Sequence, residues 1–125
     1  MLKDKMVAAT LPVVDMERAT KFYEEKLGLK VMQTDMGGVM FQAGGGTGLY
    51  LYRRGPTKAD HTVASFNVDN IEAEISDLRA KGVVFEEYDI PQMNIKTING
   101  LATAGGAKMA WFKDTEGNIL GVTQM

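Results

Sequence analysis

Two stretches of the 125-residue chain share one pattern, and they decide the fold. The first is VVDMERATKFYEEKLGLKV at residues 13–31, and the second is NVDNIEAEISDLRAKGVVF at residues 67–85. Each runs from the end of a hydrophobic stretch through an aspartate, an amphipathic pattern and a glycine into a new hydrophobic stretch. The spacing from Asp15 to Gly28 equals that from Asp69 to Gly82. We therefore interpret the two stretches as an internal repeat.

Both repeats carry the signals of a capped helix. Asp15 in the first repeat, and Asp69 or Asn70 in the second, can accept hydrogen bonds from the first free backbone N–H groups of a helix. Hydrophobic residues then recur with helical spacing, and Gly28 and Gly82 can adopt the left-handed conformation that ends a helix. The sequence therefore predicts one helix in each repeat.

Short stretches rich in Val, Phe, Tyr and Leu, bounded by glycines, predict the strands around each helix. One strand precedes each helix and three follow it. They lie at residues 7–14, 29–34, 38–43 and 48–54 in the first repeat and at residues 61–68, 83–90, 107–114 and 118–124 in the second. The predicted fold class is α+β, with two βαβββ modules in tandem. We expect a single domain over residues 1–125, with one module at about 5–55 and the other at about 60–125.

Composition narrows the classes of function. The chain is 45% hydrophobic and 24% charged, with a net charge of −2 and with acidic and basic residues interspersed. This balance argues against a nucleic-acid partner and against a polybasic membrane-binding segment. The chain has no cysteine, which excludes disulfides and thiolate chemistry. Because the sequence shows neither a signal peptide nor a hydrophobic run long enough to span a bilayer, we expect a cytoplasmic protein.

The stretches that carry the repeat resemble the vicinal oxygen chelate superfamily, which includes glyoxalases, extradiol dioxygenases and bleomycin-resistance proteins. They are LPVVDMERATKFYEEKLGLKV at residues 11–31, FNVDNIEAEISDLRAKGV at residues 66–83 and WFKDTEGNILGV at residues 111–122. The resemblance extends over nearly the whole chain. It implies two cupped sheets with helices on their outer faces, a cleft formed by the concave faces, and a homodimer. In the metalloenzymes of the superfamily, His, Gln or Glu side chains hold a divalent metal ion that acts as a Lewis acid.

At the positions that the resemblance assigns to metal ligands, this chain carries no suitable donor. These positions hold Ala8, Val63 and Gly121, with Tyr50 or Tyr52 expected at the fourth. Relatives carry glutamate where this chain has Gly121. A metal site of this class needs imidazole, amide or carboxylate ligands. We therefore expect no metal at the usual site and no other cofactor.

Without the metal, the predicted cleft is lined by aromatic and small polar side chains. Strand alternation turns Tyr50 and Tyr52 away from the helix-facing Leu49 and Leu51. The same alternation places His61 and Ser65 on the face of Val63, whereas Trp111 can lie on either face. The candidate ligand-binding residues are Thr10, Tyr50, Tyr52, His61, Ser65, Trp111 and Gly121. No catalytic residue is assigned.

A long irregular segment, DIPQMNIKTINGLATAGG at residues 89–106, lies within the second module. Segments of this length in a compact domain often form lids or binding loops. Met93 and Ile95 are therefore expected to close over a hydrophobic ligand.

Three hypotheses about function remain open. The first is a metal-independent protein that binds a small molecule in an aromatic-lined cleft. The alternative is a metal-dependent lyase or dioxygenase of the glyoxalase superfamily with a displaced site, in which His61 and a tyrosine take part. In the third, the aromatic strand faces form a dimer interface. His61, the only histidine, is either a proton-transfer group or a solvated strand end beside Asp60.

Overall fold

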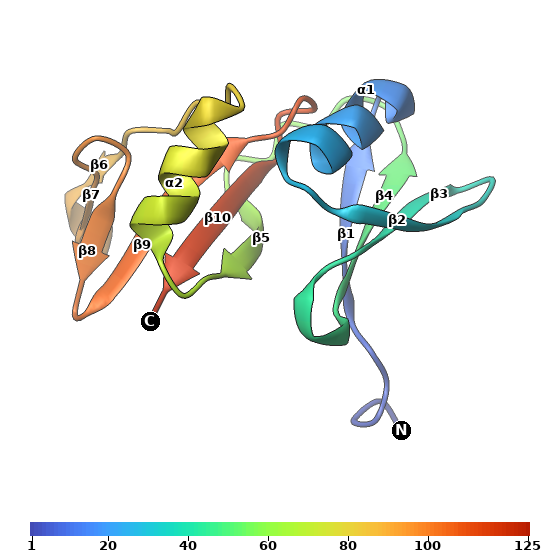
Figure 1. Ribbon diagram of the computed structural model, residues 1–125, viewed down its shortest axis with the longest axis horizontal. Coiled ribbons are helices and arrows are strands. Elements are labelled where there is room, and N and C mark those ends of the chain that lie inside the picture. The colour runs from blue at the N-terminus through green and yellow to red at the C-terminus, as the bar shows by residue number, and fades with distance from the viewer. The chain divides into compact units, whose positions relative to one another are not determined.

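The computed structural model describes all 125 residues, and the chain divides into two compact units. Unit 1 is Met1–Lys58 and unit 2 is Ala59–Met125. Each unit holds one four-stranded mixed sheet and one α-helix longer than a single turn, as Figure 1 shows. The α+β class predicted from the repeat is confirmed. None of the helices has the length and hydrophobicity that crossing a membrane would require.

Unit 1 has the predicted order of one strand, one helix and three strands. Its elements are β1 (Ala8–Val13), α1 (Met16–Lys21) with a π-helical turn (Phe22–Lys26), β2 (Lys30–Thr34), β3 (Gly38–Gln42) and β4 (Gly48–Arg53). The strand order in the sheet is β1-β4-β3-β2. β1 pairs with β4 in parallel, and the other neighbours are antiparallel.

Unit 2 repeats this topology and adds a small ribbon. Its elements are β5 (Thr62–Asn67), α2 (Ile71–Ala80), β6 (Asp89–Ile90), a 3-10 turn (Pro91–Met93), β7 (Ile95–Lys96), β8 (Ala102–Ala104), β9 (Ala107–Lys113) and β10 (Ile119–Gln124). The sheet order is β5-β10-β9-β8, with β5 and β10 parallel. The two units therefore share the same strand order as well as the repeated sequence pattern.

The helix ends follow the local signals of the sequence. The Oδ1 atom of Asp15 accepts a hydrogen bond from the backbone N–H of Arg18 at 3.1 Å. In unit 2 the cap is Asn70, because its Oδ1 accepts from the backbone N–H of Ala73 at 3.1 Å. Gly28 and Gly82 have φ values of 73° and 89°, the left-handed conformation expected at both helix ends.

The prediction of a strand at residues 83–90 was wrong. This segment contributes only an isolated bridge between Phe85 and Phe112 and the two residues of β6. The fourth strand of the sheet is β8, whose sequence ATA carries little β-propensity. The Phe85 ring instead packs edge-on against the Phe112 ring, with 5.6 Å between ring centroids. Val84 before this contact is exposed, and one backbone hydrogen bond after it, from the N–H of Glu86 to the carbonyl of Trp111 at 2.8 Å, still joins the segment to β9.

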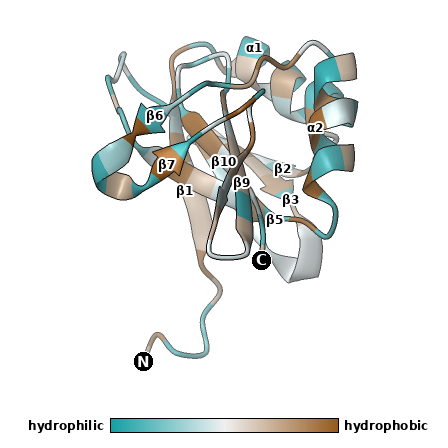
Figure 2. Cartoon of the chain, turned by 90° about the vertical axis from the view of Figure 1, so that its left-hand side faces the viewer, coloured by the Kyte–Doolittle hydropathy of each residue, from teal (hydrophilic) through white to brown (hydrophobic).

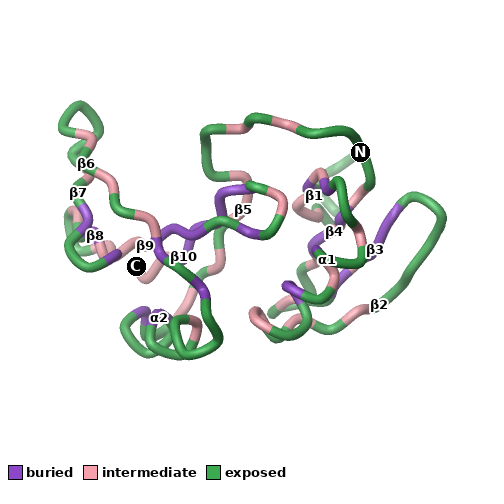
Figure 3. Tube along the Cα trace, turned by 90° about the horizontal axis from the view of Figure 1, so that it is seen from above, coloured by how far each residue is buried: buried purple, intermediate pink, exposed green.

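The sheet of unit 2 has two covered faces. α2 packs against β9 and β10 and buries Ile71 and Ile75, as Figure 1 shows. On the opposite face a smaller cluster joins Ala102, Trp111 and Ile119 to Tyr88, Ile95 and Met109. β6 and β7, which belong to the segment on this side, each combine one isoleucine with one charged residue, and Figure 2 shows both brown and teal in them. β10 is buried over most of its length, and it is largely purple in Figure 3.

Candidate functional site

A pocket of about 530 Å³ opens within unit 2, between the segment that follows α2 and the second face of the sheet. Tyr88, Ile90, Met93 and Ile95 line it from that segment. Trp111 and Ile119 line it from β9 and β10, and Asp60, His61, Thr62, Glu86 and Lys113 complete its polar lining. Aromatic and hydrophobic walls with a few polar groups, at this volume, are typical of small-molecule sites.

The pocket arises from an asymmetry between the two repeats. In unit 1, β2 begins at Lys30, the second residue after Gly28. In unit 2, β8 begins only at Ala102, the twentieth residue after Gly82. The additional residues form the β6–β7 ribbon and provide Tyr88 and the other lining residues from Ile90 to Ile95. The extra segment therefore builds the pocket on a sheet that otherwise repeats unit 1.

An aromatic pair forms one wall. The rings of Tyr88 and Trp111 lie 5.3 Å apart between centroids, at an interplanar angle of 57°. The main chain holds both residues, because the N–H of Glu86 donates to the carbonyl of Trp111 at 2.8 Å. The N–H of Tyr88 donates to Oγ1 of Thr97 at 2.7 Å, and the N–H of Thr97 donates to the carbonyl of Tyr88 at 2.8 Å. The wall is thus fixed before any ligand enters.

Charged groups lie at the more open part of the pocket. Lys113 Nζ lies 3.6 Å from Glu86 Oε1, and His61 Nδ1 lies 3.9 Å from Asp60 Oδ1. The His61 side chain is 70% exposed, which fits a solvated rim residue better than a desolvated base. Burial, followed by the negative charge of Glu86, raises the pKa of the Tyr88 hydroxyl, so this group stays protonated at neutral pH.

Two of the seven candidate residues from the sequence, His61 and Trp111, line this pocket. Ser65 and Gly121 lie in the same sheet and pair with each other across β5 and β10. Thr10, Tyr50 and Tyr52 belong to unit 1, where both tyrosines pair with β1. Sequence reasoning missed Tyr88, because it fell inside the strand wrongly predicted at 83–90.

The alternation assumed for β5 does not hold at its start. The pairing with β10 shifts register between Ile119 and Leu120, so that Thr62 pairs with Ile119 and Ser65 with Gly121. A Cβ atom built on Gly121 would lie 3.4 Å from Thr62 Cγ2 and 2.5 Å from Ser65 Oγ. Thr62 therefore shares a face with Ser65. The internal repeat could have identified Thr62 from the sequence, because the offset that aligns Asp15 with Asp69 also aligns Ala8 with Thr62.

The residues present do not fit a metal ion at the positions that the resemblance implies. Ala8, Val63 and Gly121 have no donor side chain, and the Ser65 hydroxyl lies where a side chain at position 121 would begin. Nowhere in the chain do three or more His, Asp or Glu side chains converge closely enough to hold a metal. We therefore derive no chemistry through a metal.

Tyr50, expected at the fourth ligand position, has a partner of its own in unit 1. Its hydroxyl donates to Asp35 Oδ1 at 3.0 Å, and the same oxygen accepts from the backbone N–H groups of Gly37 and Gly38 at 2.8 and 2.9 Å. The hydrogen bond from Tyr50, followed by those from the two glycines, lowers the pKa of the Asp35 carboxyl. Burial and Asp35 raise the pKa of Tyr50.

Replacing Tyr50 by phenylalanine is expected to raise the pKa of Asp35 toward its ordinary value. A carboxyl group with a depressed folded-state pKa contributes stability above its unfolded-state pKa and loses it as the pH falls through the folded-state pKa. The variant should therefore lose part of the stability that the Asp35 carboxylate contributes at pH values above its unfolded-state pKa. NMR titration of the Asp35 carboxyl carbon measures the change, with Tyr52→Phe as the matched control. An unchanged Asp35 titration in Tyr50→Phe would contradict the assigned hydrogen bond.

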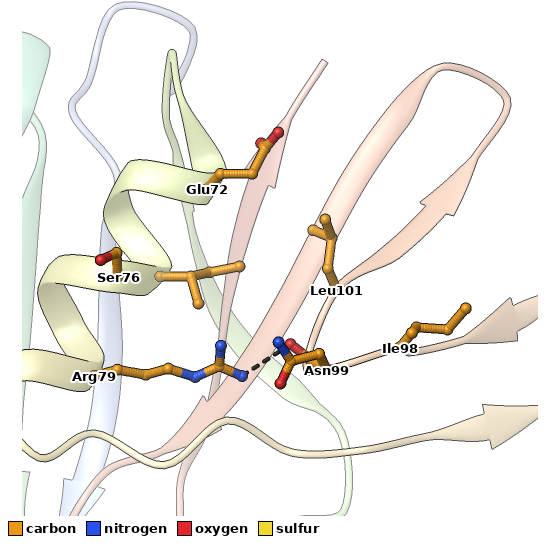
Figure 4. Close-up of a pocket in the computed structure, with 7 residues that line it drawn as sticks. Glu72, Ser76, Arg79, Ile98, Asn99 and Leu101 are labelled. Atoms are coloured by element: carbon orange, nitrogen blue, oxygen red, sulfur yellow. Dashed lines mark hydrogen bonds between the residues drawn. The ribbon is translucent and has the colours of Figure 1, made fainter.

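A second hollow of about 360 Å³ lies beside α2, next to the turn at residues 98–101. Figure 4 shows Arg79 reaching from α2 to this turn, where Nη2 donates to the carbonyl of Asn99 at 2.8 Å. The same guanidinium lies over the Phe85 ring, 5.5 Å from its centroid. Glu72, also in the lining, forms an ion pair with Lys108 at 2.9 Å. The Arg79 hydrogen bond holds the turn against α2, and the Glu72–Lys108 pair joins α2 to β9, so we assign the hollow a structural role.

Comparisons with known proteins place this geometry among related folds. The family model described as Glyoxalase/Bleomycin resistance protein/Dioxygenase superfamily matches residues 5–122. A search of curated proteins found no significant match.

Three solved structures illustrate the similarity. TnmS3, an antibiotic binding protein from Streptomyces sp. CB03234, is 21% identical with a TM-score of 0.75, over 99% of this chain and 98% of that chain. Lactoylglutathione lyase from Agrobacterium tumefaciens is 17% identical with a TM-score of 0.72, over 99% and 96%. Oxidase ChaP-H2 is 17% identical with a TM-score of 0.72, over 99% and 95%. At these identities the likeness establishes a shared fold.

Proposed function

Because the chain belongs to the glyoxalase/bleomycin resistance protein/dioxygenase superfamily, we propose that it binds a small, partly aromatic molecule in the pocket of unit 2 without a metal ion. The observation that carries the proposal is the preformed wall of Tyr88 and Trp111 beside hydrophobic residues of the β6–β7 ribbon. A binding protein needs such a pocket, whereas the metal chemistry of the superfamily needs ligands that this chain lacks at the implied positions.

The composition of the pocket supports an aromatic ligand. A flat ring can pack against Trp111 and Tyr88, since offset and edge-on aromatic contacts are worth about 0.5–1.5 kcal/mol beyond area burial. Ile90, Ile95 and Ile119 add hydrophobic surface around these rings. The similarity in fold to TnmS3, an antibiotic binding protein, agrees with a binding role.

Met93 is suited to cover the ligand. It lines the pocket yet is 63% exposed, and it follows Pro91 in the 3-10 turn between β6 and β7. An unbranched, flexible side chain can adjust to different ligand shapes. The main chain around it turns sharply at Asn94, which has a φ of 55°. We propose that this turn acts as an adaptable cover on the fixed aromatic wall.

Naphthalene is a suitable probe, because Trp111 is the only tryptophan and gives one indole N–H signal in a ¹⁵N NMR spectrum. We expect a saturable shift of this signal, with the same affinity after EDTA treatment and after addition of Zn²⁺, Ni²⁺, Mn²⁺ or Fe²⁺. Met93→Glu should weaken binding by about 3- to 10-fold, since it places a charge against a hydrophobic ligand. Met36→Glu, at a fully exposed position of unit 1, is the matched control.

The outcomes separate the open hypotheses. Absence of a saturable shift would overturn the binding proposal. Binding that appears only after a metal is added would favour the alternative of a metal-dependent lyase or dioxygenase with a displaced site. Equal weakening by Met93→Glu and Met36→Glu would place the ligand outside the pocket of unit 2.

A further inference from the structure

We infer that the ligand carries a hydrogen-bond acceptor, a ring nitrogen or a carbonyl oxygen, at the edge that meets the indole N–H of Trp111. This inference deepens the proposed function and rests on it. It assigns Trp111 a second role besides its ring surface, as the donor that selects among flat aromatic molecules.

The first argument is the state of the indole N–H. Trp111 is only 9% exposed, yet its indole N–H donates to no protein group, because the hydrogen bonds of this residue are main-chain bonds. No fully buried side-chain nitrogen or oxygen lacks a partner anywhere in the chain. The indole N–H must therefore reach solvent through the small open part of Trp111, and Trp111 lines the pocket. The nearly buried Trp111 side chain thus offers the pocket one polar group, the indole N–H, which can only donate a hydrogen bond.

The second argument concerns the polar groups beside the aromatic wall of the pocket. The Tyr88 hydroxyl has no protein partner and stays protonated. The carbonyl of Trp111, by contrast, already accepts a hydrogen bond from the N–H of Glu86. The carboxylate of Glu86 is paired with Lys113. A ligand that fills the pocket therefore meets an N–H and an O–H group that have no partner within the protein.

These donors favour one class of ligand over another. A purely hydrocarbon ligand would displace water from the indole N–H and leave the donor without a partner, which costs binding free energy. A ligand with an acceptor at that edge would replace the lost hydrogen bond. One neutral hydrogen bond changes affinity by about 3- to 10-fold. The pocket should therefore prefer nitrogen heterocycles and aromatic ketones to hydrocarbons of the same shape.

Naphthalene and quinoline test this preference, because they share one shape and differ by a single ring nitrogen. The experiment uses the full chain in mildly alkaline buffer, where quinoline is uncharged. We expect quinoline to bind about 3- to 10-fold more tightly than naphthalene. Quinoline should also move the indole N–H signal downfield, as hydrogen bonding does, whereas naphthalene should cause only a ring-current shift.

Two variants locate the donor. Trp111→Phe keeps an aromatic ring and removes the N–H. It should therefore reduce the ratio of quinoline affinity to naphthalene affinity to about one, as measured by ligand-observed NMR. Tyr88→Phe removes the second donor and should leave most of the preference. Thermal denaturation shows whether each variant is folded.

The results distinguish failure of the inference from failure of the proposed function. Equal affinities of quinoline and naphthalene for the unchanged protein would agree with the proposed binding pocket but overturn the donor role of Trp111. Loss of the preference in Tyr88→Phe but not in Trp111→Phe would also overturn it. Binding of neither probe would remove the proposed function and the inference together.

Discussion

Replacing Asp114 by alanine is expected to lower the free energy of unfolding by about 3 to 5 kcal/mol, because one carboxylate organises the turn between β9 and β10. Asp114 is 7% exposed. Its Oδ1 accepts from the backbone N–H groups of Glu116 and Asn118, both at 2.8 Å, and its Oδ2 accepts from Asn118 Nδ2 at 2.9 Å. Asn118 is 1% exposed, so its amide would lose this partner where water cannot replace it.

The same substitution should disturb the ligand pocket. The turn sets the register in which Trp111 pairs with Gly121 and Lys113 with Ile119. A slip by one residue would turn Trp111 to the side of the sheet that α2 covers. We therefore expect Asp114→Ala to weaken naphthalene binding at temperatures where the variant remains folded.

Urea denaturation measures the change, with Thr115→Ala as the control in the same turn. Thr115 is exposed, and its hydroxyl bonds only to the partly exposed Glu116 side chain, at 2.9 Å. Its replacement should change stability by less than about 0.5 kcal/mol. Similar losses in both variants would show that Asp114 has no special role in the turn.

The parts of the fold that sequence reasoning predicted depend on local signals. Asp15, Asn70, Gly28 and Gly82 act through hydrogen bonds and backbone angles within a few residues. The sequence therefore predicts the helix ends, although it left Asp69 and Asn70 as alternative caps of the second helix. Strand alternation is equally local in β4. Leu51 is fully buried and Tyr50 only partly, as the pattern predicted.

The parts that sequence reasoning missed depend on contacts distant in the chain. β8 is a strand because β9 offers it an edge, and its sequence ATA gives little sign of this. The face of Thr62 depends on a register shift against β10, which no property of β5 reveals. The candidate site divides in the same way. Trp111 was found from its residue type, whereas Tyr88 needed the path of the segment that leaves the sheet after Glu86.

Replacing Gly38 by alanine is expected to lower the free energy of unfolding by about 3 kcal/mol, because β3 lies too close to β4 for a side chain at this position. A Cβ atom at Gly38 would overlap the carbonyl oxygen and carbon of Leu51. Leu51 is fully buried between β1 and β3, so its main chain cannot move aside without disturbing both neighbours. The Asp35 turn would also shift, since its carboxylate binds the N–H of Gly38.

Gly48→Ala provides the matched control in the adjacent strand. A Cβ atom at Gly48 would meet Met40 Sδ, the flexible part of a side chain, at 3.1 Å. Its other neighbours are the Phe41 carbonyl oxygen at 3.4 Å and Ala8 Cβ at 4.0 Å, which are close to ordinary contact distances. Because a methionine side chain can rotate away, this substitution should cost less than about 1 kcal/mol. Denaturation of the two variants in urea compares them directly. Equal losses would mean that general strand packing, rather than the approach to the Leu51 carbonyl, sets the requirement for glycine. A large loss confined to Gly38→Ala would show that the spacing of β3 and β4, which also holds Tyr50 beside Asp35, depends on this glycine.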